Sequence, residues 1–341
     1  MTNPVPAPLP TSVAVIGAGS WGTALAALLA SKLPRVTLWC LETEVAEGIH
    51  REHRNPLYVS EFLLPANLQA ETDLQAVAAS HAVLILVVPT PFIRRILTSL
   101  VEVVGPETLF VFASKGVEVE TLTLISDIHA ELFGPTGLQR ACFLSGPSFA
   151  REVLQGLPTA VAIAGQSAEV VGQMQRLFHT PSFRTYSSED VIGVELGGAL
   201  KNVMALAAGI SDGLGFGCGA RAALLTRGLV EIVRLGLRLG AQAETFSGLS
   251  GMGDLLLTAT SPLSRNYTVG WRLGKGESLA AILSGSREVA EGVKTTLSVR
   301  RLAEKRQIEM PIATAVYDIL YENRDPRAVV KALMERDLKS E

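Results

Sequence analysis

The sequence of 341 residues is poor in cysteine, in aromatic residues and in charge of either sign. It holds three cysteines, 6% aromatic and 18% charged residues, with a formal net charge of −3 at pH 7. Cys40, Cys142 and Cys218 are too few and too far apart for a disulfide framework or a zinc site, so we expect buried thiols in a reducing compartment. No metal site is expected. Because arginine and lysine are scattered rather than massed, we expect no nucleic-acid partner.

The sequence also lacks a long, uninterrupted apolar run. Val83–Pro89 is too short to cross a bilayer, and Val191–Ile210 is interrupted by Glu195 and Lys201. Residues 1–11 are rich in proline and have no charged n-region, which predicts an extended tail rather than a signal peptide. We therefore expect a cytoplasmic protein without a membrane span.

Hydrophobic residues make up 48% of the chain. Because the chain is longer than most domains with a single hydrophobic core, two domains are expected. Residues 12–190 alternate short apolar runs with helical patterns such as Gly22–Ser31 and Pro91–Val104. The runs are continuous rather than alternating, which is typical of parallel strands covered on both faces. The predicted strands are Val13–Ile16, Val36–Trp39, Val83–Val88, Leu109–Ala113, Cys142–Leu144 and Thr159–Ile163.

The pattern changes near residue 190, after which strand-like runs are scarce. Helices are predicted at Val191–Gly209, Ala220–Gly240, Arg265–Leu273, Ser278–Gly285, Thr295–Lys305 and Pro311–Tyr321. The predicted fold is therefore α/β: a Rossmann-type, doubly wound sheet over residues 12–190, followed by a mostly α-helical C-terminal domain over residues 191–341.

A glycine-rich turn, Gly17-Ala18-Gly19-Ser20-Trp21-Gly22, lies between the first predicted strand and a helical pattern. In such a turn Gly17 permits the tight bend, Gly19 lets the backbone approach a pyrophosphate, and Gly22 lets the helix pack on the strand. Glu42 lies 20 residues past Gly22, where a carboxylate meets the adenosine ribose. The sequence therefore predicts a dinucleotide site for NAD or NADP.

The choice between the two cofactors depends on the residues after the second strand. Residues 40–44, Cys-Leu-Glu-Thr-Glu, contain no cation that could accept a 2′-phosphate, although Arg51 and Arg54 lie further along the chain. This stretch favours NAD.

Hydride transfer to a carbonyl also needs a proton donor, and the helical domain contains no histidine. Lys201 is surrounded on its predicted helix by Gly197, Gly198, Met204 and Ala205, which are small or apolar. Burial there would lower the pKa of a lysine towards a useful range. The alternative, a structural lysine that snorkels or pairs with a carboxylate, stays open.

Three further segments carry polar groups beside glycine turns or helix starts. Lys115 follows the strand at Leu109–Ala113, at the edge of the sheet where ligands bind. Residues 144–150 offer backbone amides and the Ser148 hydroxyl. Residues 248–266 hold Asp254 and, at a predicted helix start, Ser264-Arg265-Asn266, which is suited to a phosphate. Ser264 and Asp254 could instead serve only as helix caps.

Seven segments together resemble one family. VIGAGSWGTALA, SKGVE, LSGPSFA, ALKNVMALAAGI, GMGDLLLT, SRN and EGVKT, in this order, are similar to the NAD(P)-dependent sn-glycerol-3-phosphate dehydrogenase of the bacterial type. The resemblance covers residues 12–335. It implies reversible hydride transfer between NAD(P)H and dihydroxyacetone phosphate, giving sn-glycerol 3-phosphate for phospholipid synthesis.

The resemblance also implies roles for individual residues. Lys201 would be the catalytic proton donor and acceptor. The implied cofactor contacts are Gly17, Gly19, Ser20, Trp21, Gly22, Lys115, Ala150, Arg265, Val289 and Glu291. The implied substrate contacts are Lys115, Gly146, Ser148, Lys201, Asn202, Asp254, Thr258, Ser264, Arg265 and Asn266, with the last three at the phosphate.

One departure from the family concerns the end of the second strand. Many members carry Arg or His about where Cys40-Leu41 stands here, so a strong preference for NADP is in doubt. Two other functions stay open: a β-hydroxyacid dehydrogenase of similar two-domain build, and a non-catalytic dinucleotide sensor. A small phosphate-bearing substrate is the expected partner, and a homodimer is left open.

Overall fold

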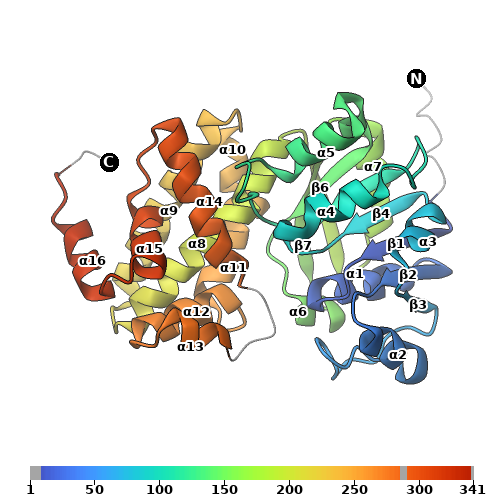
Figure 1. Cartoon of the computed structure of the whole chain (residues 1–341), viewed down its shortest axis with the longest axis horizontal. Helices are drawn as coiled ribbons and strands as arrows, with labels where there is room; N and C mark the ends of the chain where they lie inside the picture. Colours follow the sequence, from blue (N-terminus) through green and yellow to red (C-terminus); the bar gives the residue numbers. More distant parts are fainter. Residues whose placement is uncertain (1–8, 285–289, 339–341) are drawn as a thin grey trace. The chain divides into compact units, whose positions relative to one another are not determined.

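The computed structural model describes residues 9–284 and 290–338, which form two compact units (Figure 1). The first unit holds the chain up to Ser114 together with Ile125–Val194. The second holds Lys115–Leu124 and the chain from Glu195 onward. Most of the N-terminal tail expected at residues 1–11 lies outside the described residues. The boundary expected at residue 190, as a division between domains, stays a prediction.

The first unit is built on an eight-stranded sheet with the order β3-β2-β1-β4-β5-β6-β7-β8. The strands are β1 (Ser12–Ile16), β2 (Arg35–Trp39), β3 (Leu68–Glu71), β4 (Val83–Leu86), β5 (Leu109–Phe112), β6 (Ala141–Ser145), β7 (Thr159–Gly165) and β8 (Phe183–Ser188). All neighbouring strands are parallel except β6 and β7. The strand order reverses between β1 and β4, and ligands of such sheets bind at this point of reversal.

Helices cover both faces of this sheet (Figure 1). They are α1 (Ser20–Ala30), α2 (Thr43–Glu52), α3 (Leu74–Ala79), α4 (Thr90–Leu100), α5 (Ile125–Phe133), η1 (Pro135–Arg140), α6 (Ala150–Leu154) and α7 (Ala168–Phe178). Val13 and Val15 of β1 belong to the core that α1, α2, α6 and α7 cover. Ala14 and Ile16 belong to the opposite core under α3, α4 and α5. Because β1 is buried on both faces, its apolar run does not alternate.

In the part of the second unit that the structure describes, all regular elements are helices, whereas Lys115–Leu124 forms neither helix nor strand (Figure 1). Its helices are α8 (Val191–Gly213), α9 (Cys218–Arg238), α10 (Ala243–Ser247), η2 (Leu249–Gly253), α11 (Asp254–Thr260), α12 (Arg265–Gly274), α13 (Leu279–Ser284), α14 (Glu291–Arg306), α15 (Pro311–Tyr321) and α16 (Pro326–Met334). Helix α8 is buried along almost its whole length, as expected for a helix that is apolar all round.

Small residues let α8 and α12 pack backbone against backbone. A Cβ on Gly209 would collide with the Tyr267 carbonyl, and a Cβ on Gly270 would collide with the Leu206 carbonyl. Gly213 and Gly274 meet in the same way one turn further along. The start of α12, where the phosphate site is expected, is therefore held tightly against α8.

Among the described residues, α8 is also the one helix long and apolar enough to cross a membrane. Its mean hydropathy stays high although Glu195 and Lys201 lie within it, so these two residues do not interrupt the apolar stretch as expected. However, 83% of its most apolar window is buried inside the protein, which is typical of a core helix.

The predicted fold class is confirmed. The sequence analysis missed β3 and β8, because these two edge strands alternate buried and exposed residues and contain no continuous apolar run. The expectation of three buried thiols is wrong for Cys218, which begins α9 and is exposed, whereas Cys40 and Cys142 are buried.

Candidate functional site

The glycine turn leaves an open stretch of backbone between β1 and α1. Gly17 has a φ of 113°, which favours glycine, and a Cβ on Gly22 would collide with the Gly17 carbonyl. Gly19 is the N-cap of α1, and no atom lies within 4 Å of the place where its Cβ would be. The backbone at Gly19 and the N-terminus of α1 can therefore approach a pyrophosphate.

Among the buried polar atoms of the first unit that have no hydrogen-bond partner in the described part of the chain are Trp21 Nε1, Thr90 Oγ1 and Ser145 Oγ. Trp21 lies in the first turn of α1, Thr90 begins α4 just after β4, and Ser145 ends β6. Strands β1, β4 and β6 run in the same direction, so all three residues lie at the carboxyl edge of the sheet. Unpaired buried polar atoms are costly, so these three fit a polar ligand such as a dinucleotide.

Thr90 and Ser145 were not among the predicted site residues. A signal for them was present in the sequence, because each is a hydroxyl residue that comes at or shortly after the end of a strand. Their lack of partners, however, is visible only once the neighbouring strands are in place.

Asn55 ties the next loop to the glycine turn. Its side chain is fully buried, and Nδ2 donates to the Ala18 carbonyl and to Thr23 Oγ1, both at 2.8 Å. Its Oδ1 accepts the backbone N–H groups of Leu57 and Tyr58 at 3.2 and 3.3 Å. Because one amide serves both segments, residues 55–58 are fixed beside the turn.

Residues 146–150 follow β6 and precede α6. Gly146 has a φ of 148°, and a Cβ there would lie 2.8 Å from Cα of Val161. Ser148 Oγ donates to the Gly146 carbonyl at 3.0 Å, and Ala150 begins α6. The substrate and cofactor contacts expected of these residues stay predictions.

The second unit brings two lysines to one carboxylate. Asp254 is fully buried; Lys201 donates to its Oδ1, and Lys115 donates to its Oδ2 at 2.7 Å. Thr258, one helical turn further along α11, donates to Oδ1 at 3.3 Å. Lys115 belongs to this unit because its segment is anchored to α14, where Ser298 Oγ donates to the Val117 carbonyl at 2.8 Å.

A close backbone approach explains why Lys201 meets Asp254. Gly197 lies one turn before Lys201 on α8, and a Cβ on it would collide with the Ser250 carbonyl. Ser250 lies four residues before Asp254, in the π-helical turn η2. Since residues four apart share a helix face, the contact between Gly197 and Ser250 sets the register that pairs Lys201 with Asp254.

The charges in this cluster shift one another's protonation. Burial lowers the pKa of Lys201 to about 8, although the Asp254 carboxylate raises it and Lys115 lowers it. Burial opposes ionisation of Asp254, but the two ammonium groups outweigh it and lower the pKa of that carboxyl. Burial raises the pKa of Glu291 to about 7, against the positive charges of Lys115, Lys201 and Arg265. Lys201 can therefore hold or release a proton near neutral pH.

Asn202 and Asn266 form a hydrogen-bonded pair of side chains in the second unit. Asn266 Nδ2 donates to Asn202 Oδ1 at 2.9 Å, and Asn266 Oδ1 accepts the Gly292 N–H at 3.0 Å. A Cβ on Gly292 would lie 2.7 Å from Asn266 Oδ1, so only glycine fits there. These two hydrogen bonds link α8, α12 and the start of α14, where Glu291 lies.

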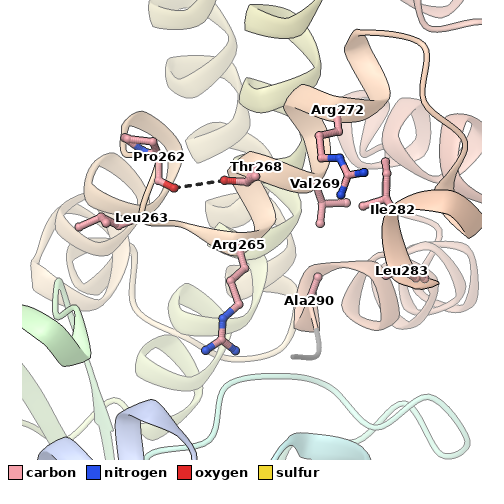
Figure 2. Close-up of a pocket in the computed structure, with 9 residues that line it drawn as sticks. All are labelled: Pro262, Leu263, Arg265, Thr268, Val269, Arg272, Ile282, Leu283 and Ala290. Atoms are coloured by element: carbon pink, nitrogen blue, oxygen red, sulfur yellow. Dashed lines mark hydrogen bonds between the residues drawn. The ribbon is translucent and has the colours of Figure 1, made fainter. Parts of the chain in front are cut away.

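The expected phosphate residues lie at the start of α12. Ser264 is its N-cap and accepts the Tyr267 N–H at 3.2 Å, so the predicted helix start is confirmed. Arg265 lies on the wall of a cavity of about 180 Å³, and its guanidinium points away from Arg272 (Figure 2). The remaining wall consists of Pro262, Leu263, Thr268, Val269, Arg272, Ile282, Leu283 and Ala290.

The predicted site residues thus fall into two groups, one in each unit. The first unit holds the glycine turn with Ser20 and Trp21, and the segment from Gly146 to Ala150. The second holds Lys115, Lys201, Asn202, Asp254, Thr258, Ser264, Arg265, Asn266 and Glu291. Val289 lies outside the described residues. Within those residues no group of three or more His, Cys, Asp or Glu side chains could hold a metal ion.

Comparison with known proteins agrees with this arrangement. The family model of the NAD-dependent glycerol-3-phosphate dehydrogenase N-terminus matches residues 12–171, and that of the C-terminus matches residues 190–331. A glycerol-3-phosphate dehydrogenase [NAD(P)+] of Syntrophotalea carbinolica is 49% identical over 330 residues, covering 97% of this chain and 99% of its own. Its counterpart in Geobacter metallireducens is 51% identical over 329 residues, covering 96% of this chain and 98% of its own.

A solved structure gives the same result. The glycerol-3-phosphate dehydrogenase of Coxiella burnetii is 38% identical and superimposes with a TM-score of 0.92, covering 96% of this chain and 100% of its own. Both family models match in chain order, and together they span the glycine turn and the two-lysine cluster. The chain belongs to the NAD-dependent glycerol-3-phosphate dehydrogenase family.

Proposed function

We propose that the protein catalyses reversible hydride transfer between NAD(P)H and dihydroxyacetone phosphate, giving sn-glycerol 3-phosphate for phospholipid synthesis. The observation that carries the proposal is the buried cluster in which Asp254 accepts from both Lys201 and Lys115. A group that can hold a proton near neutral pH in a dry site is what reduction of a ketone requires. Bound NAD(P)H supplies the hydride.

In this proposal Lys201 acts at the C2 oxygen of the substrate. Its ammonium donates a proton as the oxygen gains negative charge, and the neutral amine takes the proton back in the reverse reaction. Asp254 keeps the ammonium oriented and charged in spite of its burial, because the carboxylate raises the pKa that burial lowers. Lys115, held by the same carboxylate, adds positive charge near the developing alkoxide.

The phosphate end of the substrate is assigned to the start of α12. Arg265 supplies a guanidinium suited to a phosphate, and the first N–H groups of α12 add a favourable dipole. The Asn266 side chain already bonds to Asn202 and to the Gly292 N–H, so its first contribution is to fix this helix start. Its second Nδ2 hydrogen could donate to the phosphate. Binding at the phosphate orients the reacting carbon from a distance.

The dinucleotide is assigned to the glycine turn of the first unit. Open backbone at Gly19 and the unpartnered Trp21 Nε1 support this assignment. Thr90 and Ser145 offer further hydroxyl groups at the same edge of the sheet.

The test is steady-state turnover of purified protein. We expect oxidation of NADH or NADPH only when dihydroxyacetone phosphate is added, with product confirmed as sn-glycerol 3-phosphate. Turnover with a β-hydroxy or β-keto acid instead would favour the rival dehydrogenase. Binding of both cofactors without turnover of either substrate class would favour the dinucleotide sensor.

The proposal extends to location and assembly. Because its substrate and cofactor are cytoplasmic metabolites, we place the enzyme in the cytoplasm, which cell fractionation tests. A homodimer is the proposed assembly, and the exposed apolar residues Val230 and Leu237, seven positions apart on α9, are its proposed contact residues. Light scattering of the purified chain should then give twice the monomer mass.

A further inference from the structure

The segment after β2 presents a carboxylate that a neighbouring phenol orients. Glu42 is the N-cap residue of α2, but its side chain does not cap the helix. Its Oε1 instead accepts the hydroxyl of Tyr58 at 2.8 Å. Tyr58 is in turn fixed through the buried Asn55, which also holds the glycine turn. The carboxylate is therefore placed by contacts that continue to the dinucleotide turn itself.

The two arginines that could serve a 2′-phosphate are engaged elsewhere. Arg51 forms an ion pair with Glu47, one turn earlier on α2. Arg54 donates from Nη1 to the Ser60 carbonyl at 2.9 Å. Each contact directs its guanidinium to a partner other than Glu42.

The local charge is also unfavourable for an added phosphate. Burial, followed by the negative charge of Glu42, raises the pKa of the Cys40 thiol to about 12, although a backbone hydrogen bond with Glu71 opposes this rise. The positive end of the α2 dipole would attract an anion, but Glu44 already lies in its first turn. A 2′-phosphate, which carries close to two negative charges near neutral pH, would meet acidic side chains here.

We propose that Glu42, oriented by Tyr58, makes this enzyme selective for NAD over NADP. The carboxylate would accept the ribose hydroxyls of NAD and repel the 2′-phosphate of NADP. This inference rests on the proposed dinucleotide site and names which of the two cofactors that site takes. It assigns Glu42 as a specificity residue and Tyr58 as the residue that positions it.

The experiment measures binding to the purified protein without turnover. Titration calorimetry with NADH and NADPH, and then with ADP-ribose and 2′-phospho-ADP-ribose, separates the adenosine end from the nicotinamide end. We expect NADH to bind about tenfold or more tightly than NADPH, and ADP-ribose to bind more tightly than 2′-phospho-ADP-ribose by a similar factor. The reason is that the 2′-phosphate removes the ribose hydroxyl that would donate to the charged Glu42 carboxylate. Equal binding, or tighter binding of the phosphorylated form, would overturn the inference while leaving the dinucleotide site intact.

Two variants separate charge from orientation. Glu42→Gln should reduce the preference for NADH about tenfold, mainly through tighter NADPH binding. Tyr58→Phe should weaken NADH binding a few-fold and leave NADPH binding as weak as in the parent protein. Glu52→Gln, which neutralises an exposed carboxylate at the end of the same helix, should leave the preference unchanged. An unaltered preference in Glu42→Gln would contradict the assignment. Failure of the parent protein to bind either cofactor would instead refute the dinucleotide site and the proposed function with it.

Discussion

The ammonium group of Lys201 and the carboxylate of Asp254 form an ion pair inside the helical unit, with Asp254 fully buried and Lys201 7% exposed. Burying a charged group costs desolvation free energy unless an opposite charge pairs with it. Here one carboxylate faces two ammonium groups, because Lys115 lies 2.7 Å from its other oxygen. The cluster therefore keeps a net positive charge in a desolvated place, which suits an oxygen that becomes negative during a reaction.

Replacement of Lys201 by alanine should remove the proton donor and lower turnover of dihydroxyacetone phosphate by about 100- to 10,000-fold. Binding of NADH should change little, because Lys201 lies outside the dinucleotide turn. Steady-state rates and a fluorescence titration with NADH measure the two effects. Lys305→Ala, an exposed lysine on α14, is the matched control and should retain the parent rate. A Lys201→Ala rate within a few-fold of the parent would remove Lys201 from the chemistry.

The pH profile should reflect the lowered pKa of Lys201. Ketone reduction needs the ammonium form, so its rate should fall as pH rises through about 8, while glycerol phosphate oxidation should increase over the same range. Asp254→Asn removes a charge that raises the pKa of Lys201, so the fall should begin at lower pH. A profile for that variant unchanged from the parent, or shifted upward, would show that Asp254 does not tune the lysine.

Arg265→Ala should raise the KM for dihydroxyacetone phosphate by about tenfold or more, because a charge-assisted contact to the phosphate is lost. The matched control is Arg272→Ala, which changes another arginine of the same cavity wall. Arg272 already pairs with Glu277, so its removal should leave the KM near the parent value. Similar KM values for the two variants would place the phosphate elsewhere.

Gly270→Ala should destabilise the protein by about 1–3 kcal/mol, because the new methyl group would collide with the Leu206 carbonyl of α8. Gly219→Ala on α9 meets no atom within 4 Å and should change stability by less than about 1 kcal/mol, on the stabilising side. Chemical denaturation of the three proteins measures the difference. Equal stability of the two variants would contradict the close packing of α8 against α12.

The features that depend on residues close together in the chain can be predicted from the amino-acid sequence. Gly17 and Gly22 specify the turn because a side chain at either position would strain or block it, and Gly19 leaves its backbone open. Ser264 specifies a helix start because its hydroxyl accepts the N–H of Tyr267. The apolar surroundings of Lys201 were likewise visible as helix neighbours. These effects act within one or two turns of the chain, so they are encoded locally.

Contacts between residues far apart in the chain follow instead from the packing of the folded protein. Asp254 lies 53 residues from Lys201 and 139 from Lys115, and no local pattern indicates that one carboxylate serves both. Their meeting depends on the approach of Ser250 to Gly197, just as the Glu42 partner depends on a loop held by Asn55. Such contacts depend on how whole helices and strands pack against one another. That packing is the net result of many weak interactions, which no short segment of the sequence contains. The residue types that the chemistry needs can therefore be read from short segments of the sequence. Which of them pair, and how pairing and burial shift their pKa values, depends on the fold.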